Sequence, residues 1–175
     1  MILQDHHLRY PIGEFVLGKT YTQAETNDHI SNIESFPSKL LDFLVTFPTD
    51  QLAKPYRPGG WTGNQVIHHL ADSHMNALLR LKLALTEDNP TIKPYPEQKF
   101  AELADYVSDK VAFSMILLYA IHTKWAILLN SISESDWSRS FYHPSSDYTY
   151  TIQESTAQYS WHCDHHFAHL KLLKE

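Results

Sequence analysis

The stretch that decides the fold is "TGNQVIHHLADSHMNALLRLKLAL", residues 62–85. Thr62 and Gln65 have the spacing of a capping box, which predicts that a helix starts here. Apolar residues then occur on almost every side of the helical wheel, a pattern typical of a buried helix. A segment with two prolines and a Gly-Gly pair precedes it at residues 53–61, and a segment with three prolines follows it at residues 87–98. The sequence therefore predicts one long buried helix with a loop at each end.

Three further stretches show helical periodicity. In residues 22–47, apolar side chains recur at spacings of three and four, and Pro37 predicts either a kink or a division into two helices. Residues 108–132 form the next stretch. The last one begins after Thr151, a second candidate for a capping residue, and ends near residue 173. These stretches and residues 62–85 make four long helices.

A short aromatic segment, "SFYHPSSDYTYT" at residues 140–151, predicts a small hairpin before the last helix. The 175 residues contain no repeat and no linker, and their number suits one domain. The expected fold class is therefore all-α, an up-down four-helix bundle with a small hairpin, in a single domain over residues 1–175. The interior of such a bundle is a common place for a metal site.

Composition narrows the class of protein. The net charge of −6 argues against binding of nucleic acid, which requires a basic face. Cys163 is the only cysteine, so no disulfide can form within the chain, and a reducing compartment is expected. Residues 1–15 lack the apolar run of a signal peptide, and no uninterrupted apolar run approaches 18 residues. We therefore expect a cytoplasmic protein without membrane contact.

The last helix carries "WHCDHHFAHL", residues 161–170, with four histidines. Three interpretations are open: a metal site, a catalytic base with its neighbours, or a polar helix face rich in histidine. Histidines four residues apart lie on one side of a helix, where their imidazoles can bind one ion. Two such pairs exist, and His162/His166 lies nearer the apolar side of the helix than His165/His169. We expect His162 and His166 to point into the protein.

The third ligand is expected from the helix at residues 62–85. One row of polar side chains runs along it: His69, Ser73, Asn76 and Arg80. Polar side chains on a buried helix need partners, because burial without them costs roughly 2–7 kcal/mol. A polar cavity facing the last helix satisfies this need and favours His69 as the third ligand. The alternative is that the row only forms hydrogen bonds with neighbouring helices.

Four other side chains near the predicted site have roles to be assigned. Asp72 is either a carboxylate that holds a ligand imidazole or a surface residue. Cys163 points away from the ligands, so a buried structural thiol is expected. Arg57 and Trp61 can line the mouth of the cavity, and the alternative for Trp61 is that it packs the preceding loop against the helix.

Five segments resemble the YfiT-type proteins of the DinB superfamily, and together they cover nearly the whole chain. They are "YPIGE" (10–14), "PYRPGGWTGNQVIHHLADSHMN" (55–76), "RLKLALTEDNPTIKPY" (80–95), "FYHP" (141–144) and "WHCDHHFAH" (161–169). The resemblance implies an up-down four-helix bundle with one divalent metal per subunit, zinc or nickel. The family's ligand positions fall on His69, His162 and His166. Gly63 stands where a bulkier residue is expected, which predicts a looser first turn.

The resemblance also implies a homodimer. A second apolar stripe on the last helix points the same way, because unpartnered apolar side chains often mark a contact with another subunit. The stripe consists of Trp161, Ala168 and Leu172.

The family implies a metal-dependent hydrolase that acts through a metal-activated water on a small-molecule substrate. In this hypothesis Asp72 or a neighbouring histidine moves the proton, and Asn76 and Arg80 orient a polar or anionic substrate. Relatives in the superfamily imply an alternative, a thiol S-transferase that uses bacillithiol or another low-molecular-weight thiol. A second alternative is a metal-binding stress protein without catalysis, which requires a fourth protein ligand on the metal.

Overall fold

The computed structural model describes residues 2–174, with side chains from residue 6 onward. The helices are α1 (Ile2–Arg9), α2 (Gln23–Val45), α3 (Gly63–Thr86), α4 (Glu97–Phe100), α5 (Val111–Leu129) and α6 (Ile152–Leu172). Two short 3-10 helices cover Thr49–Ala53 and Glu134–Ser138, and the two strands are β1 (Ser140–His143) and β2 (Tyr148–Thr151).

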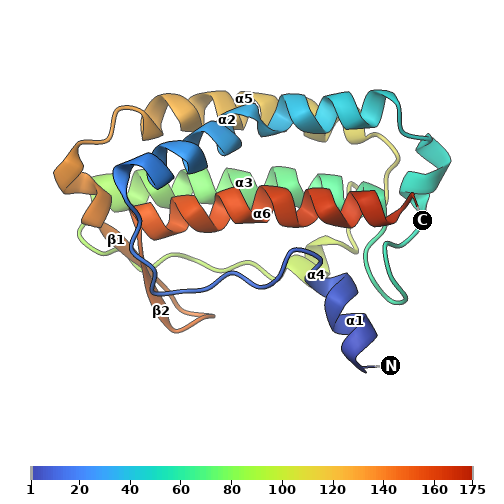
Figure 1. The fold of residues 1–175 in the computed structure, drawn as a ribbon, viewed down its shortest axis with the longest axis horizontal. Helices are drawn as coiled ribbons and strands as arrows, with labels where there is room; N and C mark the ends of the chain where they lie inside the picture. Colours follow the sequence, from blue (N-terminus) through green and yellow to red (C-terminus); the bar gives the residue numbers. More distant parts are fainter. Residues whose placement is uncertain (1, 175) are drawn as a thin grey trace.

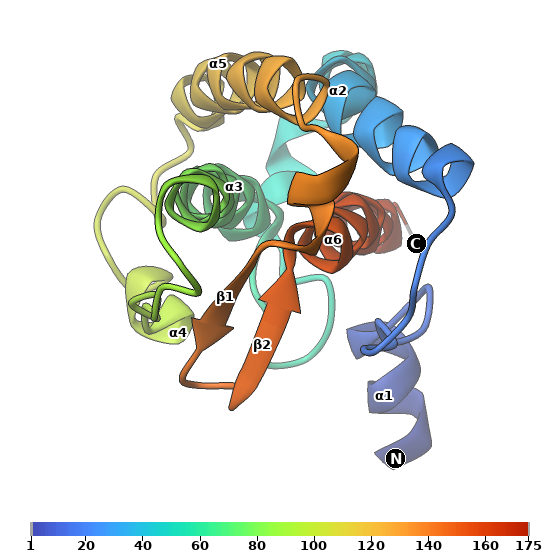
Figure 2. The ribbon, with the colours of Figure 1, turned by 90° about the vertical axis from the view of Figure 1, so that its left-hand side faces the viewer.

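The four long helices α2, α3, α5 and α6 form a bundle, which confirms the predicted all-α four-helix fold (Figure 1). Each of α5 and α6 packs against both α2 and α3, so the order around the bundle is α2, α5, α3, α6 (Figure 2). Helices α2 and α6 run in one direction and α3 and α5 in the other. The long connection at residues 87–110 returns along the bundle and makes α5 parallel to α3, so the directions of successive helices do not alternate as an up-down bundle requires.

The helices start where the sequence predicts. Thr22 and Thr62 each form a complete capping box, with Glu25 and Gln65 respectively, and the Thr151 hydroxyl accepts a hydrogen bond from the Glu154 backbone. These bonds satisfy backbone N–H groups that have no partner within the helix.

Helix α2 continues through Pro37 without a break, so the division into two helices does not occur. The effect of the proline is local. Proline has no backbone N–H, and the carbonyl of Ile33, four residues earlier, therefore lacks its usual helical donor. This carbonyl can accept a hydrogen bond from outside the helix.

Two apolar clusters fill the bundle, one toward each end. One contains Ile33, Leu81 and Trp125, and the other contains Phe36 and Leu70 together with further side chains of all four helices. Between them lies a polar layer in which His74 and His122 are almost completely buried. Buried imidazoles need hydrogen-bond partners, so the two histidines must bond to each other or to neighbouring groups.

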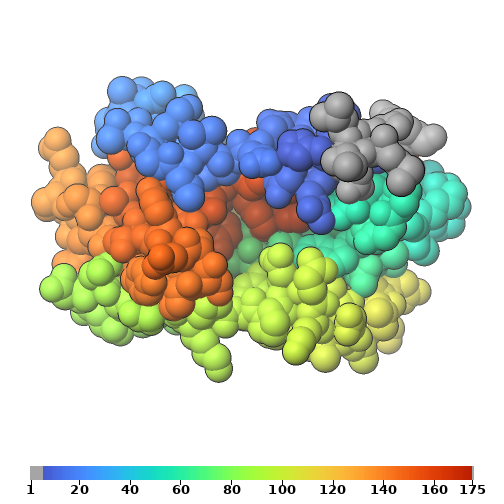
Figure 3. Space-filling model, turned by 90° about the horizontal axis from the view of Figure 1, so that it is seen from below, coloured from blue at the N-terminus to red at the C-terminus, as the bar shows by residue number. Residues whose placement is uncertain are grey.

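One face of the bundle, formed by α3 and α6, is covered by irregular segments. These are the N-terminal arm at residues 10–21, the connection at 87–110 and the β-hairpin, which confirms the predicted hairpin. Ser140 pairs with Thr151 in the hairpin, and a bridge between Thr91 and Tyr142 joins it to the connection. Figure 3 shows this face, with a hollow between the covering segments at the bottom of which α6 is visible.

The arm also changes the interpretation of Trp161. Its indole N–H donates to the carbonyl of Gly13 at 3.3 Å, and its ring lies 6.0 Å from that of Phe15. Trp161 therefore packs against the chain's own arm, which accounts for its apolar position without a second subunit. Helical periodicity alone does not indicate which segment covers an apolar stripe.

Helix α5 has apolar side chains on its outer side as well as toward the core. It is the one helix in the described part of the chain that is long and apolar enough to cross a membrane. Only 28% of the 18-residue apolar segment that meets this test is buried. Phe113, Ile116 and Ile127 are each more than 60% exposed. In the part of the chain that the structure describes, these side chains form an apolar outer face on α5.

Candidate metal centre

Three histidines from two helices meet under the covering segments. His69 comes from α3, and His162 and His166 come from α6 one turn apart. Their candidate ligand atoms all lie within 4.8 Å of one another, and the Nε2 atoms of His69 and His162 are 3.3 Å apart. Two nitrogens bound to one tetrahedral zinc at about 2.0–2.1 Å each are about 3.4 Å apart. The geometry therefore fits a single ion.

The electrostatics of the three histidines also suit a metal. Burial lowers the pKa of His69 to about 3 and holds the pKa values of His162 and His166 well below the ordinary value. All three are neutral at pH 7, which is the form that binds metal. The Nδ1 atom of His69 is buried without a hydrogen-bond partner, so its imidazole is not committed to another role.

Two cavities meet at His162. The smaller, about 330 Å³, is lined by His69, His166, Arg57 and Trp61 among others. Arg57 and Trp61 thus line the cavity. The Trp61 ring lies 4.7 Å from that of His69 and also packs against the apolar core, so both interpretations of Trp61 apply.

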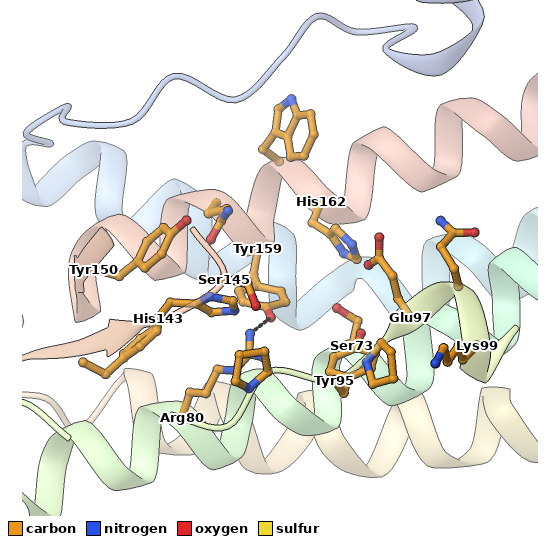
Figure 4. A pocket seen from close by; sticks show the side chains of 16 residues that line it. Ser73, Arg80, Tyr95, Glu97, Lys99, His143, Ser145, Tyr150, Tyr159 and His162 are labelled. Atoms are coloured by element: carbon orange, nitrogen blue, oxygen red, sulfur yellow. Dashed lines mark hydrogen bonds between the residues drawn. The ribbon is translucent and has the colours of Figure 1, made fainter. Parts of the chain in front are cut away.

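The larger cavity, about 550 Å³, lies between α3, α6, the hairpin and the segment at residues 94–99 (Figure 4). Its walls carry aromatic rings together with Ser73 and Arg80. Both cavities are lined by Glu97, Gln98, Trp161 and His162. The larger cavity therefore reaches the histidines directly at His162, with Glu97 in the shared wall.

The other two histidines of the cluster are buried as well, contrary to the expectation that they lie further from the interior. His165 is 7% exposed and His169 is 2% exposed. Tyr10 lies beside His165, Tyr56 stacks on His169 at 4.0 Å, and the Arg9 carbonyl accepts a hydrogen bond from His169 Nε2 at 3.0 Å. The covering segments cause this burial, which a helical wheel cannot reveal.

A second set of histidines, His165, His166 and His169, is equally compact and shares His166 with the first. His169 already uses Nε2 on the Arg9 carbonyl, and its Nδ1 faces His166 Nδ1 at 3.3 Å. In the first set, the ring nitrogens face one another, and the histidines come from two helices. It is the better metal site of the two.

The structure separates the three residues predicted to act beside the metal. The Asp72 carboxylate accepts a hydrogen bond from the Tyr106 hydroxyl at 2.9 Å and lines a cavity with His68 and Ser108, away from the three histidines. The side-chain amide of Asn76 donates to the Asp72 carbonyl on its own helix. The structure therefore does not bring these two to the site, because each turns toward a nearer partner.

Arg80 does face the larger cavity. It is 8% exposed, and its guanidinium donates to the Tyr159 hydroxyl at 3.2 Å. Its Nε atom is buried without a hydrogen-bond partner. Cys163 is fully buried in the core, as expected, and burial raises its pKa well above the ordinary value.

The sequence patterns predict no role for His74 of α3. His74 Nε2 lies 3.0 Å from His162 Nδ1, and His74 Nδ1 lies 2.7 Å from His122 Nε2. An available signal was that both histidines lie in long helices of the predicted bundle, where a buried imidazole needs a partner.

Known proteins share this fold. The model of the DinB superfamily matches residues 32–170. A relative from Oceanobacillus iheyensis, named "Putative metal-dependent hydrolase", is 46% identical over 165 residues, which cover 94% of this chain and 95% of the relative. YfiT from Bacillus subtilis carries the same description and is 40% identical over 167 residues, 95% of this chain and 94% of YfiT.

The solved structure of YfiT is similar along almost its whole length. The TM-score is 0.92 at 40% identity, with 95% of each chain covered, and that protein is described as "a probable metal-dependent hydrolase with an unusual four-helix bundle topology". Fold, histidine geometry and sequence identity thus point to one family. This chain belongs to the DinB superfamily.

Proposed function

We propose that this protein is a metal-dependent hydrolase that uses His69, His162 and His166 as metal ligands. The observation that carries the proposal is the 3.3 Å separation of two neutral imidazole nitrogens from different helices, where two cavities meet. Among the described residues, only these three histidines form the compact group that contains His69. A three-histidine site leaves a coordination position open, as catalytic zinc sites do.

The metal is proposed to be zinc, with nickel as the alternative, since imidazole suits both ions. A divalent ion held by three neutral imidazoles supplies Lewis acidity, which makes water nucleophilic near neutral pH. The chain's own residues must then hold the substrate and accept a proton.

Glu97 is the proposed proton acceptor, in place of Asp72. Its side chain lines both cavities and extends toward His162 (Figure 4). Removal from water raises the pKa of its carboxyl group. A carboxylate with a raised pKa at the substrate's path is suited to general base catalysis.

Arg80 is proposed to bind an anionic group of the substrate. Among the described residues, no carboxylate forms a salt bridge with its buried guanidinium. A buried cation without an anion is costly, so a substrate carboxylate would relieve this cost. Tyr159 holds the guanidinium and precedes His162 by three residues, about 4.5 Å along the helix axis. The carboxylate would therefore lie a few bonds from the scissile group.

The test compares two chromogenic esters on zinc-loaded and metal-free protein: the 4-nitrophenyl monoester of glutarate and the neutral 4-nitrophenyl butyrate. We expect zinc-dependent hydrolysis with a preference for the anionic ester. Glu97→Gln should lower kcat about 100-fold or more, whereas Glu102→Gln, an exposed neighbour, should not. Arg80→Met should remove the preference for the anionic ester.

Other outcomes would replace the proposal. Equal rates with and without zinc would remove the metal from the reaction. Turnover of electrophiles only in the presence of a low-molecular-weight thiol would indicate a transferase. Stoichiometric zinc without turnover of any ester or amide would indicate a binding protein.

A further inference from the structure

We infer that His74 and His122 are positioning residues that set the tautomer of His162, and with it the ring nitrogen that His162 presents to the metal site. The inference rests on the proposed use of His162 as a ligand and is independent of the reaction catalysed. The two histidines lie in the polar layer between the apolar clusters, and neither belongs to the set of three ligands.

A chain of imidazoles crosses the bundle in the order in which the helices are arranged around it (Figure 2). It starts at the carbonyl of Ile33 on α2, which contacts His122 Nδ1 on α5. His122 Nε2 lies 2.7 Å from His74 Nδ1 on α3, and His74 Nε2 lies 3.0 Å from His162 Nδ1 on α6. Each of the four helices thus contributes one member.

The first member of the chain depends on Pro37. Its missing N–H leaves the Ile33 carbonyl without a helical donor, and His122 supplies the donor instead. A carbonyl oxygen only accepts hydrogen bonds, so His122 must carry its proton on Nδ1.

The positions of the protons on His74 and His162 follow from the proton on His122 Nδ1. His122 and His74 are almost completely buried, and their hydrogen-bond partners are imidazoles and a carbonyl, so each ring is neutral and carries a single N–H. With its proton on Nδ1, His122 accepts at Nε2, so His74 must donate from Nδ1. His74 then accepts at Nε2, and His162 must donate from Nδ1.

The result is a free lone pair on Nε2 of His162. That atom is the one that lies 3.3 Å from Nε2 of His69. The proton arrangement derived from a carbonyl on α2 therefore agrees with the nitrogen that the ligand geometry selects on α6. Ligand histidines in metal sites are commonly held in this way, but by one carboxylate, carbonyl or water rather than by a chain of imidazoles.

His166 shows a shorter version of the same construction. The Arg9 carbonyl accepts from His169 Nε2, which leaves His169 Nδ1 to accept from His166 Nδ1 at 3.3 Å. The lone pair of His166 is then on Nε2 as well. Each of the two ligands on α6 thus donates a hydrogen bond from Nδ1 to another histidine. Each of these chains of hydrogen bonds ends at a backbone carbonyl.

The first test is a measurement of tautomers in the full-length metal-free protein at pH 8 by long-range proton–nitrogen NMR, with single His→Gln variants for assignment. We expect His122, His74 and His162 all to carry the proton on Nδ1. A proton on Nε2 of either His74 or His162 would overturn the inference.

The second test measures zinc affinity by competition with a chromophoric chelator. His122→Phe should weaken zinc binding about 10-fold or more, the size of effect seen when outer partners of ligands are lost. His122→Gln retains a donor and an acceptor and should stay within about 3-fold of wild type, by the same principle. The control is His68→Gln, because His68 is buried on α3 but bonds to Ser114 and the Ser108 carbonyl instead.

Wild-type zinc affinity in His122→Phe would overturn the inference, as would a loss in His68→Gln equal to that in His122→Phe. If His122→Phe does not fold, His122→Gln and the tautomer measurement still decide the matter. Zinc-dependent hydrolysis can be absent while the tautomer and affinity results both hold. Failure of the proposed function is therefore distinguishable from failure of this inference.

Discussion

At the scale of single residues, the main feature of this protein is that histidine side chains are buried in their neutral form. Nine histidines have pKa values lowered with burial as the largest cause. Seven of them lie in the candidate metal site or next to it: His69, His74, His122, His162, His165, His166 and His169. A carboxylate in contact with the cluster would counter this effect, and the nearest predicted one, Asp72, bonds to Tyr106 instead. The histidines of the cluster can therefore bind a cation only in their unprotonated form.

This burial predicts the pH dependence of stability in the metal-free protein. Histidine in the unfolded chain has a pKa near 6.5, whereas burial lowers that of His69 to about 3 and that of His122 to about 4. The unfolded state therefore binds more protons below pH 6.5. Stability is complete above that pH and falls as the pH drops toward 4, by about 1.4 kcal/mol per pH unit for each histidine protonated on unfolding.

Urea unfolding of metal-free protein between pH 8 and pH 4.5 measures this dependence. Saturating zinc should add stability at pH 8 and lose that increment as protons compete for the ligands. A free energy of unfolding that stays level from pH 7 to pH 5 would contradict the neutral, buried state of these histidines.

At the scale of elements, the sequence allows accurate prediction of what is local. The caps at Thr62 and Thr151, the long helices and the hairpin follow from short-range patterns. The meeting of His69, His162 and His166 also follows, because helical spacing and a polar row on a buried helix restrict which faces can meet. Features set by distant segments do not follow. His165 is buried by an arm with no helical pattern, and Asp72 turns toward Tyr106, 34 residues away in sequence.

Gly63 illustrates the same limit. Instead of loosening the first turn of α3, it allows a close approach: a Cβ atom there would lie 2.7 Å from Leu173 Cδ1 and 3.1 Å from Leu52 Cα. We predict that Gly63→Ala destabilises the protein by about 1–3 kcal/mol, as overpacking does, although alanine has the higher helix propensity.

Urea denaturation of Gly63→Ala beside Asn64→Ala, a change at the next position of the same turn, measures the effect. Asn64→Ala should change stability by less than about 0.5 kcal/mol, as surface substitutions usually do. A more stable Gly63→Ala protein would show that the end of α6 does not pack against this turn.

At the scale of the whole molecule, the exposed apolar outer face of α5 leads us to expect that another chain packs against it. Together with Leu41 and Val45 of α2 it borders an apolar groove of about 570 Å³. We expect a homodimer through this face rather than through Trp161 and Leu172. Light scattering at micromolar concentration should give about twice the 20.3 kDa of one chain.

Substitution of Ile116 by Glu should produce a monomer, because a charge in an apolar interface lacks a partner. Val16→Glu is the matched control, since Val16 is an exposed apolar residue on the N-terminal arm. A wild-type protein that is monomeric at this concentration would leave the α5 face without the partner expected here.

The central claim is that His69, His162 and His166 hold one divalent ion, and metal content tests it most directly. Untagged protein, purified and dialysed with zinc, would be analysed by mass spectrometry alongside His69→Ala, His162→Ala, His166→Ala and His165→Ala. We predict one ion per chain in the wild type and in His165→Ala, and a severe loss in the other three. Full occupancy in His162→Ala, or loss in His165→Ala with retention in His69→Ala, would contradict the assignment and move the site to His165, His166 and His169.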